Sequence, residues 1–175
     1  MARFFDLIGT LQELNHTNVH TPRSFGQFNN QIWVASPDLS WKTLSEIIQN
    51  RSITFQSIKS FLNQLTKTID YLHLRGVQHG NVNPENVLIS DSGELKISQF
   101  GVIELISELH PLLRTTIRVP DPHYSAPQQL QTQKLSNSSD IYSIGVLIYE
   151  MLTGQLPYPF FGVASVLAAQ MTGGF

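Results

Sequence analysis

The stretch "SDIYSIGVLIYEMLTG", residues 139–154, places the strongest constraint on the fold. After Asp140 it is almost wholly apolar, and Gly154 is a typical helix stop. A helix that is apolar all round has to lie among other secondary structure, because most of its sides must be kept from water. The sequence therefore predicts a core built around a helix over residues 140–154 that is buried on most sides.

Other helices are predicted on both sides of this one along the chain. A long helix is expected within residues 53–76, because its apolar residues recur at helical spacing. Its apolar stripe is formed by Ile58, Phe61, Leu62, Leu65, Ile69 and Leu72. Shorter helices are predicted over residues 3–14, after the capping-box pair Thr43 and Glu46, and near Ala164.

Strands are predicted in two places. Residues 19–36 have the pattern of two strands joined by an Asn-Asn turn, with Ile32 and Val34 as buried positions. "VLIS" and "ELKIS" are two more strands, joined by a hairpin turn at residues 91–93. By contrast, residues 102–138 lack sustained periodicity and contain four Pro, so a long, largely irregular segment is expected there.

Composition excludes several classes of protein. The net charge of -2 and the lack of a dense Lys/Arg run argue against nucleic acid as a partner. The absence of Cys excludes a disulfide framework and fits a reducing, cytoplasmic setting, and six His without paired spacing predict no metal site. No signal peptide and no membrane span are predicted. The 175 residues fit one globular domain.

Four motifs in this order of elements resemble those of the protein kinase fold, in particular the bacterial Ser/Thr type. "HGNVNPENVLI" resembles the catalytic loop HRDLKPENVLI, and "SQFG" resembles the DFG segment. "YSAPQQL" resembles YMAPEQL, and "SDIYSIGVLIYEMLTGQLPY" resembles the large central helix of the C-lobe. Four matches at family spacing are far more specific than one.

The resemblance implies an α+β, kinase-like fold that covers part of a kinase domain. Residues 1–38 would form a partial N-lobe with only the regulatory helix, a hairpin and the hinge. Residues 39–175 would form a mostly helical C-lobe that is incomplete at its C-terminal end. The glycine-rich loop and the strand Lys are expected before residue 1. A fragment, a truncated gene product and a minimal relic are all open interpretations.

By resemblance, the catalytic loop is degenerate. It comprises His79, Gly80 in place of the loop Arg, Asn81 in place of the proton-accepting Asp, Asn83 in place of the loop Lys, and Asn86 at a retained metal-ligand position. An amide oxygen accepts a hydrogen bond but does not hold a proton near neutral pH. General-base assistance contributes roughly 10² to 10⁴ in rate, so no intact catalytic residue is predicted.

The metal and nucleotide positions have changed in the same way. Gln99 replaces the DFG Asp, and Mg²⁺ prefers carboxylates and phosphates, so Asn86 and Gln99 should bind it poorly. No metal or cofactor is therefore expected, and ATP and Mg²⁺ enter only if the chain belongs to an active kinase. Any nucleotide would contact the Pro37 carbonyl, the Leu39 N–H, Leu88 and Gln99. The loop amides are interpreted as drifted, with a repurposed ligand pocket as the alternative.

The scaffold positions are better preserved than the catalytic ones. Four of them match the stacked hydrophobic spine and its anchor: Leu11, His79, Phe100 and Asp140. His79 is interpreted as a packed structural residue, and Asp140 as a buried carboxylate that accepts loop N–H groups. Thr115 and Thr116 are candidate phosphorylation sites, although Gly80 provides no guanidinium to receive a phosphate.

Three functions remain open from the sequence. The favoured one is a catalytically inactive domain, a pseudokinase, that binds or regulates a protein partner which the sequence does not identify. The second is an ATP-dependent Ser/Thr protein kinase whose glycine-rich loop and Lys lie outside this chain. The third is a purely structural interaction module. Catalytic activity is not expected, because Asn81 and Gln99 stand where an enzyme of this family needs acids.

Overall fold

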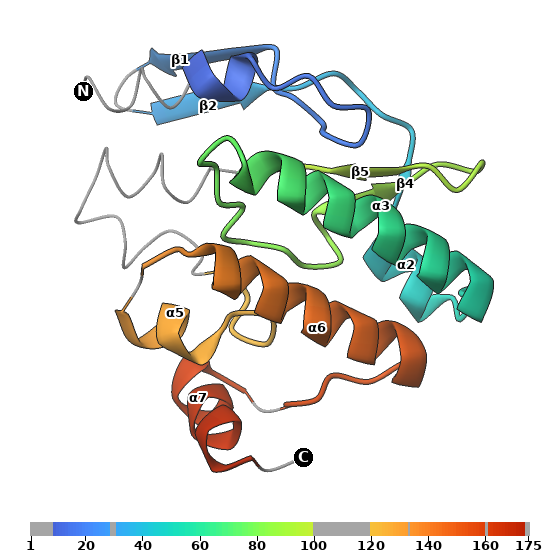
Figure 1. Cartoon of the computed structure of the whole chain (residues 1–175), viewed down its shortest axis with the longest axis vertical. Helices are drawn as coiled ribbons and strands as arrows, with labels where there is room; N and C mark the ends of the chain where they lie inside the picture. Colours follow the sequence, from blue (N-terminus) through green and yellow to red (C-terminus); the bar gives the residue numbers. More distant parts are fainter. Residues whose placement is uncertain (1–8, 29–30, 100–119, 133, 160, 174–175) are drawn as a thin grey trace.

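The computed structural model describes residues 9–28, 31–99, 120–132, 134–159 and 161–173. The elements are stacked from a β-ribbon at one end, through a long helix with a small sheet, to a group of helices near the C-terminus (Figure 1). The predicted α+β class is confirmed. Within the described ranges, no helix combines the length and the apolar character needed to cross a bilayer.

The β-ribbon is a two-stranded antiparallel sheet. β1 (Ser24–Phe28) pairs with β2 (Gln31–Ala35), and the register leaves two residues between the strands. This confirms the two predicted strands. The turn itself, residues 29–30, and the side chains of Ile32 and Val34 lie outside the described part of the chain.

A second, three-stranded sheet carries the predicted hairpin. β4 (Val87–Ile89) and β5 (Leu95–Ile97) pair antiparallel around a turn in which Gly93 has a φ of 83°. A left-handed φ favours glycine at this position. β3 (Lys42–Thr43) adds to the other edge of β4. This strand was not predicted, since two residues are too short for any strand pattern to show.

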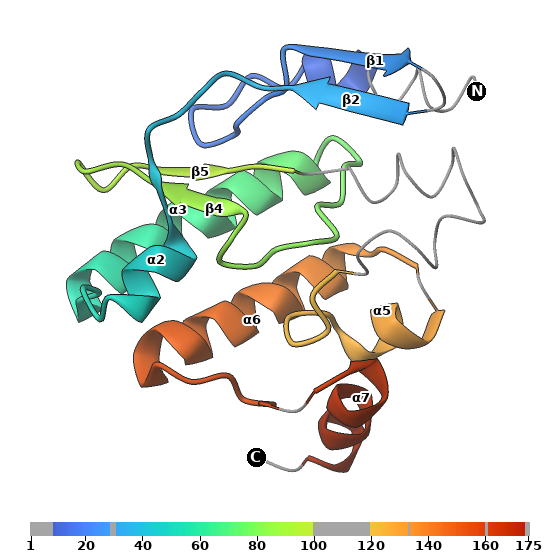
Figure 2. The ribbon, with the colours of Figure 1, turned by 180° about the vertical axis from the view of Figure 1, so that it is seen from behind.

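Two of the predicted helices precede the hairpin. α2 (Leu44–Gln49) begins with the expected capping box, in which the Thr43 hydroxyl accepts the Glu46 N–H and the Glu46 carboxylate accepts the Thr43 N–H. α3 (Phe55–His73) buries its predicted stripe except for Leu62, which is half-buried. α3 lies between the hairpin and the central helix, as both views show (Figures 1 and 2).

The central helix is α6 (Asn137–Thr153), and it ends at Gly154 with a left-handed φ of 71°, as predicted. Its predicted burial on most sides is confirmed except along one face: seven of its residues are buried, among them Ile144, Val146, Leu147 and Met151. α3 covers one side, but Ile141, Tyr149 and Leu152 are exposed by 56%, 39% and 55%. Apolar composition shows that a helix can be buried, and it does not show which elements cover it.

The helices at the two ends of the chain differ in how well the sequence indicated them. Residues 9–12 are helical, as expected, while residues 1–8 lie outside the described part. α7 (Val163–Thr172) confirms the helix predicted near Ala164. The segment 102–138, predicted to be largely irregular, is described only at residues 120–132 and 134–138; there it contains the short helix α5 (Pro127–Thr132), which was not predicted. Pro is favoured in the first turn of a helix, and six residues are too few to show periodicity.

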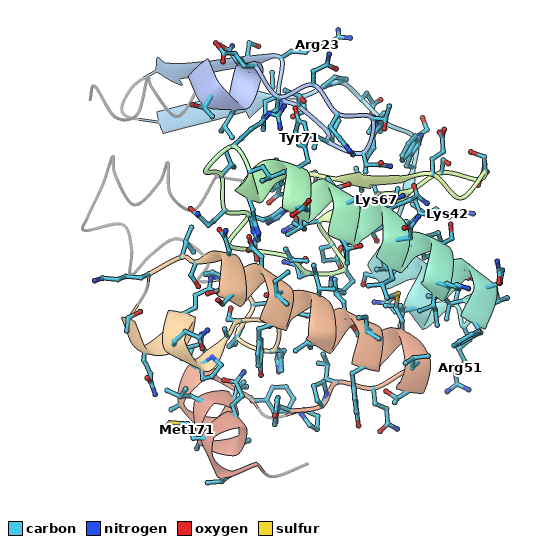
Figure 3. All side chains as sticks on the ribbon, in the orientation of Figure 1. Arg23, Lys42, Arg51, Lys67, Tyr71 and Met171 are labelled. Carbon is cyan, nitrogen blue, oxygen red and sulfur yellow. The ribbon has the colours of Figure 1, made fainter. Side chains whose placement is uncertain are left out.

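The hydrophobic core lies where α3, α6 and the hairpin meet. Its fully buried side chains include Leu11, Leu44, Leu65, Ile69, Leu72, Leu95, Ile97 and Leu147. Tyr71 joins α3 to the N-terminal segment, because its hydroxyl oxygen accepts the Asn15 N–H at 2.8 Å (Figure 3). The core therefore binds the chain before β1 to the helical part.

Candidate functional site

The loop that follows α3 is held by one buried carboxylate in the first turn of α6. Asp140 is 1% exposed; its Oδ2 accepts the His79 N–H at 2.9 Å and its Oδ1 accepts the Gly80 N–H at 2.8 Å. Nε2 of His73, at the end of α3, also hydrogen-bonds Oδ2 at 2.7 Å. These contacts satisfy a carboxylate that would otherwise be costly to bury. The prediction that Asp140 accepts loop N–H groups is confirmed, and His73 is a third partner that no sequence pattern indicated.

His79 is a fully buried imidazole. Burial lowers its pKa, an effect that the nearby charge of Asp140 opposes. Its Nδ1 accepts the Asn81 N–H at 3.2 Å, so Nε2 carries the proton and donates it to the Ser98 carbonyl oxygen at 3.0 Å. Nε2 therefore holds the loop to the residue after β5, Nδ1 holds the loop to itself, and neither nitrogen is available to a substrate.

The three loop asparagines hydrogen-bond within the loop. Nδ2 of Asn83 donates to Oδ1 of Asn81 at 2.9 Å, and Nδ2 of Asn86 donates to the Asn81 carbonyl oxygen at 2.9 Å. Oδ1 of Asn83 accepts the N–H groups of Glu85 and Asn86 at 3.0 and 3.2 Å. The amides thus close the loop on itself, as side-chain amides commonly do in turns.

Gln99, at the position of the DFG carboxylate, is exposed and has a φ of 60°. This left-handed conformation costs roughly 1–2 kcal/mol for a residue other than glycine. Residues 100–119 follow, so Phe100, Thr115 and Thr116 lie outside the described residues. The other spine positions, Leu11, His79 and Asp140, are all buried, and the complete stack stays a prediction.

The donor set at this site does not fit Mg²⁺. In the described ranges, no three His, Asp or Glu side chains are grouped closely enough to hold a metal ion. Asn81, Asn83 and Asn86 present neutral amides; Oδ1 of Asn83 already accepts a loop N–H, and Asn86 uses its Nδ2 in a loop hydrogen bond. Mg²⁺ demands hard, preferably charged oxygen ligands in octahedral geometry. At the two positions that the resemblance assigns to metal ligands, Asn86 and Gln99 provide amides and no carboxylate.

Gly80, at the position of the family's loop arginine, is closely packed. Its φ is 74°, and a Cβ atom there would lie 2.8 Å from both methyl carbons of Leu135. Its carbonyl oxygen accepts Nε2 of Gln129, a buried side chain of α5, at 2.8 Å. An apolar contact and an amide therefore surround the position at which the resemblance places the family's loop arginine. The sequence carries no local signal for either neighbour.

The hinge carbonyl that was predicted to be available to adenine is already hydrogen-bonded. Nε2 of His20 donates to the Pro37 carbonyl oxygen at 2.9 Å. Leu39 is half-buried, and Leu88 is half-buried in β4, where it pairs with Lys96 of β5. A nucleotide site formed by Pro37, Leu39, Leu88 and Gln99 stays a prediction, and His20 is a neighbour of the hinge that was not predicted.

The fold and the site define a class of protein, an α+β domain in which a buried helix anchors a kinase-type catalytic loop through one carboxylate. Comparison of the sequence with models of known protein families identifies the family. The family model described as "Protein kinase domain" matches residues 3–170, so the chain belongs to the protein kinase domain family.

Curated relatives agree with this assignment. The chain is 31% identical over 159 residues to a probable serine/threonine-protein kinase, PknB, of Lactococcus lactis; the matched region covers 90% of this chain and 25% of that protein. It is 30% identical over 145 residues to a probable serine/threonine-protein kinase of Clostridium acetobutylicum, covering 82% and 22%. It is 35% identical over 155 residues to CBL-interacting protein kinase 1 of rice, Oryza sativa, covering 86% and 33%. The chain thus spans between 22% and 33% of the length of these relatives.

Proposed function

We propose that this chain is a pseudokinase, a kinase-family domain without phosphoryl-transfer activity that binds or regulates a protein partner. The closed network of loop amides carries the proposal. Asn81 stands at the proton-accepting position, and its side-chain oxygen already accepts a hydrogen bond from Asn83. General-base assistance, worth roughly 10² to 10⁴ in rate, is therefore not provided by this loop.

The scaffold around the loop supports a role in binding. Asp140 keeps its three hydrogen bonds, so the loop retains a defined conformation without catalytic acids. A domain of this kind presents a constant surface to a partner, independent of a reaction cycle. The absence of Cys from the chain is consistent with action in the cytoplasm.

The test combines phosphoryl transfer with ligand-induced stabilisation. Purified wild-type chain, Asn81→Ala and the double variant Asn81→Asp/Gln99→Asp are incubated with Mg²⁺, labelled ATP and a basic protein substrate. We expect no incorporation by the wild type, and no rise in Tm with Mg-ATP beyond that with Mg²⁺ alone. A ligand at 100 times its Kd would add about 2.7 kcal/mol to the free energy of unfolding.

The variants separate true activity from contamination. Incorporation by the wild type that disappears in Asn81→Ala would contradict the proposal, because a contaminating kinase is indifferent to that change. A Mg-ATP response confined to the double variant would show that the two lost carboxylates account for the inactivity.

A second candidate is an ATP-dependent Ser/Thr kinase with its glycine-rich loop and Lys outside this chain. It is favoured by the similarity to probable serine/threonine-protein kinases of Lactococcus lactis and Clostridium acetobutylicum. It predicts that this chain transfers phosphate when joined to such an N-lobe. The same assay on a fusion to the N-lobe of an active kinase tests it, and incorporation that depends on Asn81 would favour this candidate.

A further inference from the structure

We propose that His20 is an internal plug of the nucleobase site, in which its imidazole N–H takes the hinge hydrogen bond that an adenine-class ligand would need. The inference rests on the proposed function and deepens it, because it gives a structural reason for such a domain to bind nucleotide weakly. Nε2 of His20 lies 2.9 Å from the Pro37 carbonyl oxygen.

The backbone around His20 aims its side chain at the hinge. The Asn18 carbonyl oxygen accepts the Ile97 N–H at 2.8 Å, and the His20 N–H donates to the Ile97 carbonyl oxygen at 2.9 Å. Val19 therefore runs parallel to β5 as a short bridge. Side chains alternate along extended backbone, and Val19 is buried in the core, so the His20 ring lies on the opposite side.

The hydrogen bond from His20 to the Pro37 carbonyl oxygen matters for nucleobase binding because of the chemistry of the hinge. Pro has no N–H, so the carbonyl is the only backbone polar group at residue 37. An adenine amino group and an imidazole N–H are both flat heteroaromatic donors, and the imidazole already takes one of the two lone pairs of this oxygen. His20 is half-buried, and its Nε2 lies 2.9 Å from the hinge oxygen, so a second donor has to approach that oxygen past the imidazole ring. The ligand class excluded is a purine that carries an exocyclic amino group.

The experiment measures adenosine binding without metal. Wild type, His20→Ala and the control His123→Ala, whose ring pairs with Asp121 instead, are titrated with adenosine in EDTA by NMR. We expect His20→Ala to bind adenosine at least tenfold more tightly than the wild type, which corresponds to about 1.4 kcal/mol. The His123→Ala control should behave as the wild type. Circular dichroism checks that each variant is folded, and His20→Val, which suits extended backbone, replaces an alanine variant that does not fold.

A measurement on the wild type supports the variants. The Nε2 proton of His20 should appear in long-range ¹H–¹⁵N spectra as hydrogen-bonded and slowly exchanging. A freely exchanging Nε2 proton overturns the plug, as does equal adenosine affinity of wild type and folded His20→Ala. These failures leave the proposed function intact, since neither reports phosphoryl transfer. Phosphate incorporation by the wild type would instead refute the proposed function.

Discussion

Replacing Asp140 with alanine tests how far the loop depends on one side chain. The change removes the acceptor of three hydrogen bonds, donated by the N–H groups of His79 and Gly80 and by Nε2 of His73. A buried donor left without an acceptor costs about 1–3 kcal/mol. The two backbone donors are fixed in place, whereas the His73 ring, 11% exposed, can turn toward water. We expect a loss of roughly 3–6 kcal/mol, out of about 5–15 kcal/mol for a typical domain.

Urea unfolding followed by circular dichroism at pH 7 measures this loss. Asp140→Asn keeps the side-chain shape and one acceptor oxygen, so its loss should be about half that of Asp140→Ala. Asp70→Ala is the matched control, because Asp70 is exposed on α3 and its removal should change the free energy of unfolding by less than about 0.5 kcal/mol.

Hydrogen exchange locates the effect within the molecule. The amide protons of His79 and Gly80 should lose protection in Asp140→Asn before the rest of the core does. A loss of less than about 1 kcal/mol in Asp140→Ala, with both amides still protected, would refute the reasoning, since three satisfied hydrogen bonds would then contribute almost nothing.

Three further predictions concern the same region. Gly80→Arg should lower the free energy of unfolding by about 1–2 kcal/mol because of the left-handed φ. The double variant Gly80→Arg/Leu135→Ala should not regain the lost free energy in urea unfolding. Full recovery would show that the clash with the Leu135 methyl groups alone caused the loss. Gln99→Gly should raise that free energy by roughly 0.5–1 kcal/mol, as glycine adopts a φ of 60° without strain, and an unchanged or lower Tm would contradict this. Burial lowers the pKa of His79 from its usual 6.5, so below pH 6.5 the unfolded chain takes up a proton that the folded chain does not. The free energy of unfolding should therefore fall as pH falls, by up to about 1.4 kcal/mol per pH unit, and His79→Phe should remove this part of the slope.

Most of the fold was predictable because its signals are local. The Thr43–Glu46 capping box, the hairpin turn and the stop at Gly154 each depend on a few adjacent residues whose geometry the sequence determines. α5 was missed because it has no such local signal: six residues around Pro127 are too few to show helical periodicity. The open face of α6 was missed because it depends on which elements pack there, and no property of the helix itself records that.

The site divides in a similar way. The loop residues could be located from their motif, and Asp140 could be inferred from the chemistry of a buried carboxylate. Their unforeseen partners come from distant positions: His73 lies 67 residues from Asp140, and His20 lies 17 residues from Pro37. Contacts of this kind are products of tertiary packing, so residue type and spacing do not disclose them.

The left-handed backbone at Gly80 limits which residues this position tolerates. Once glycine stands there, Leu135 is free to pack over it, and any other residue enters a strained conformation against that side chain. A side chain introduced at position 80 therefore has to be accommodated by a shift of Leu135 as well as by the strained backbone. Position 80 thus links the loop to the segment between α5 and α6, so that a change in one is felt in the packing of the other.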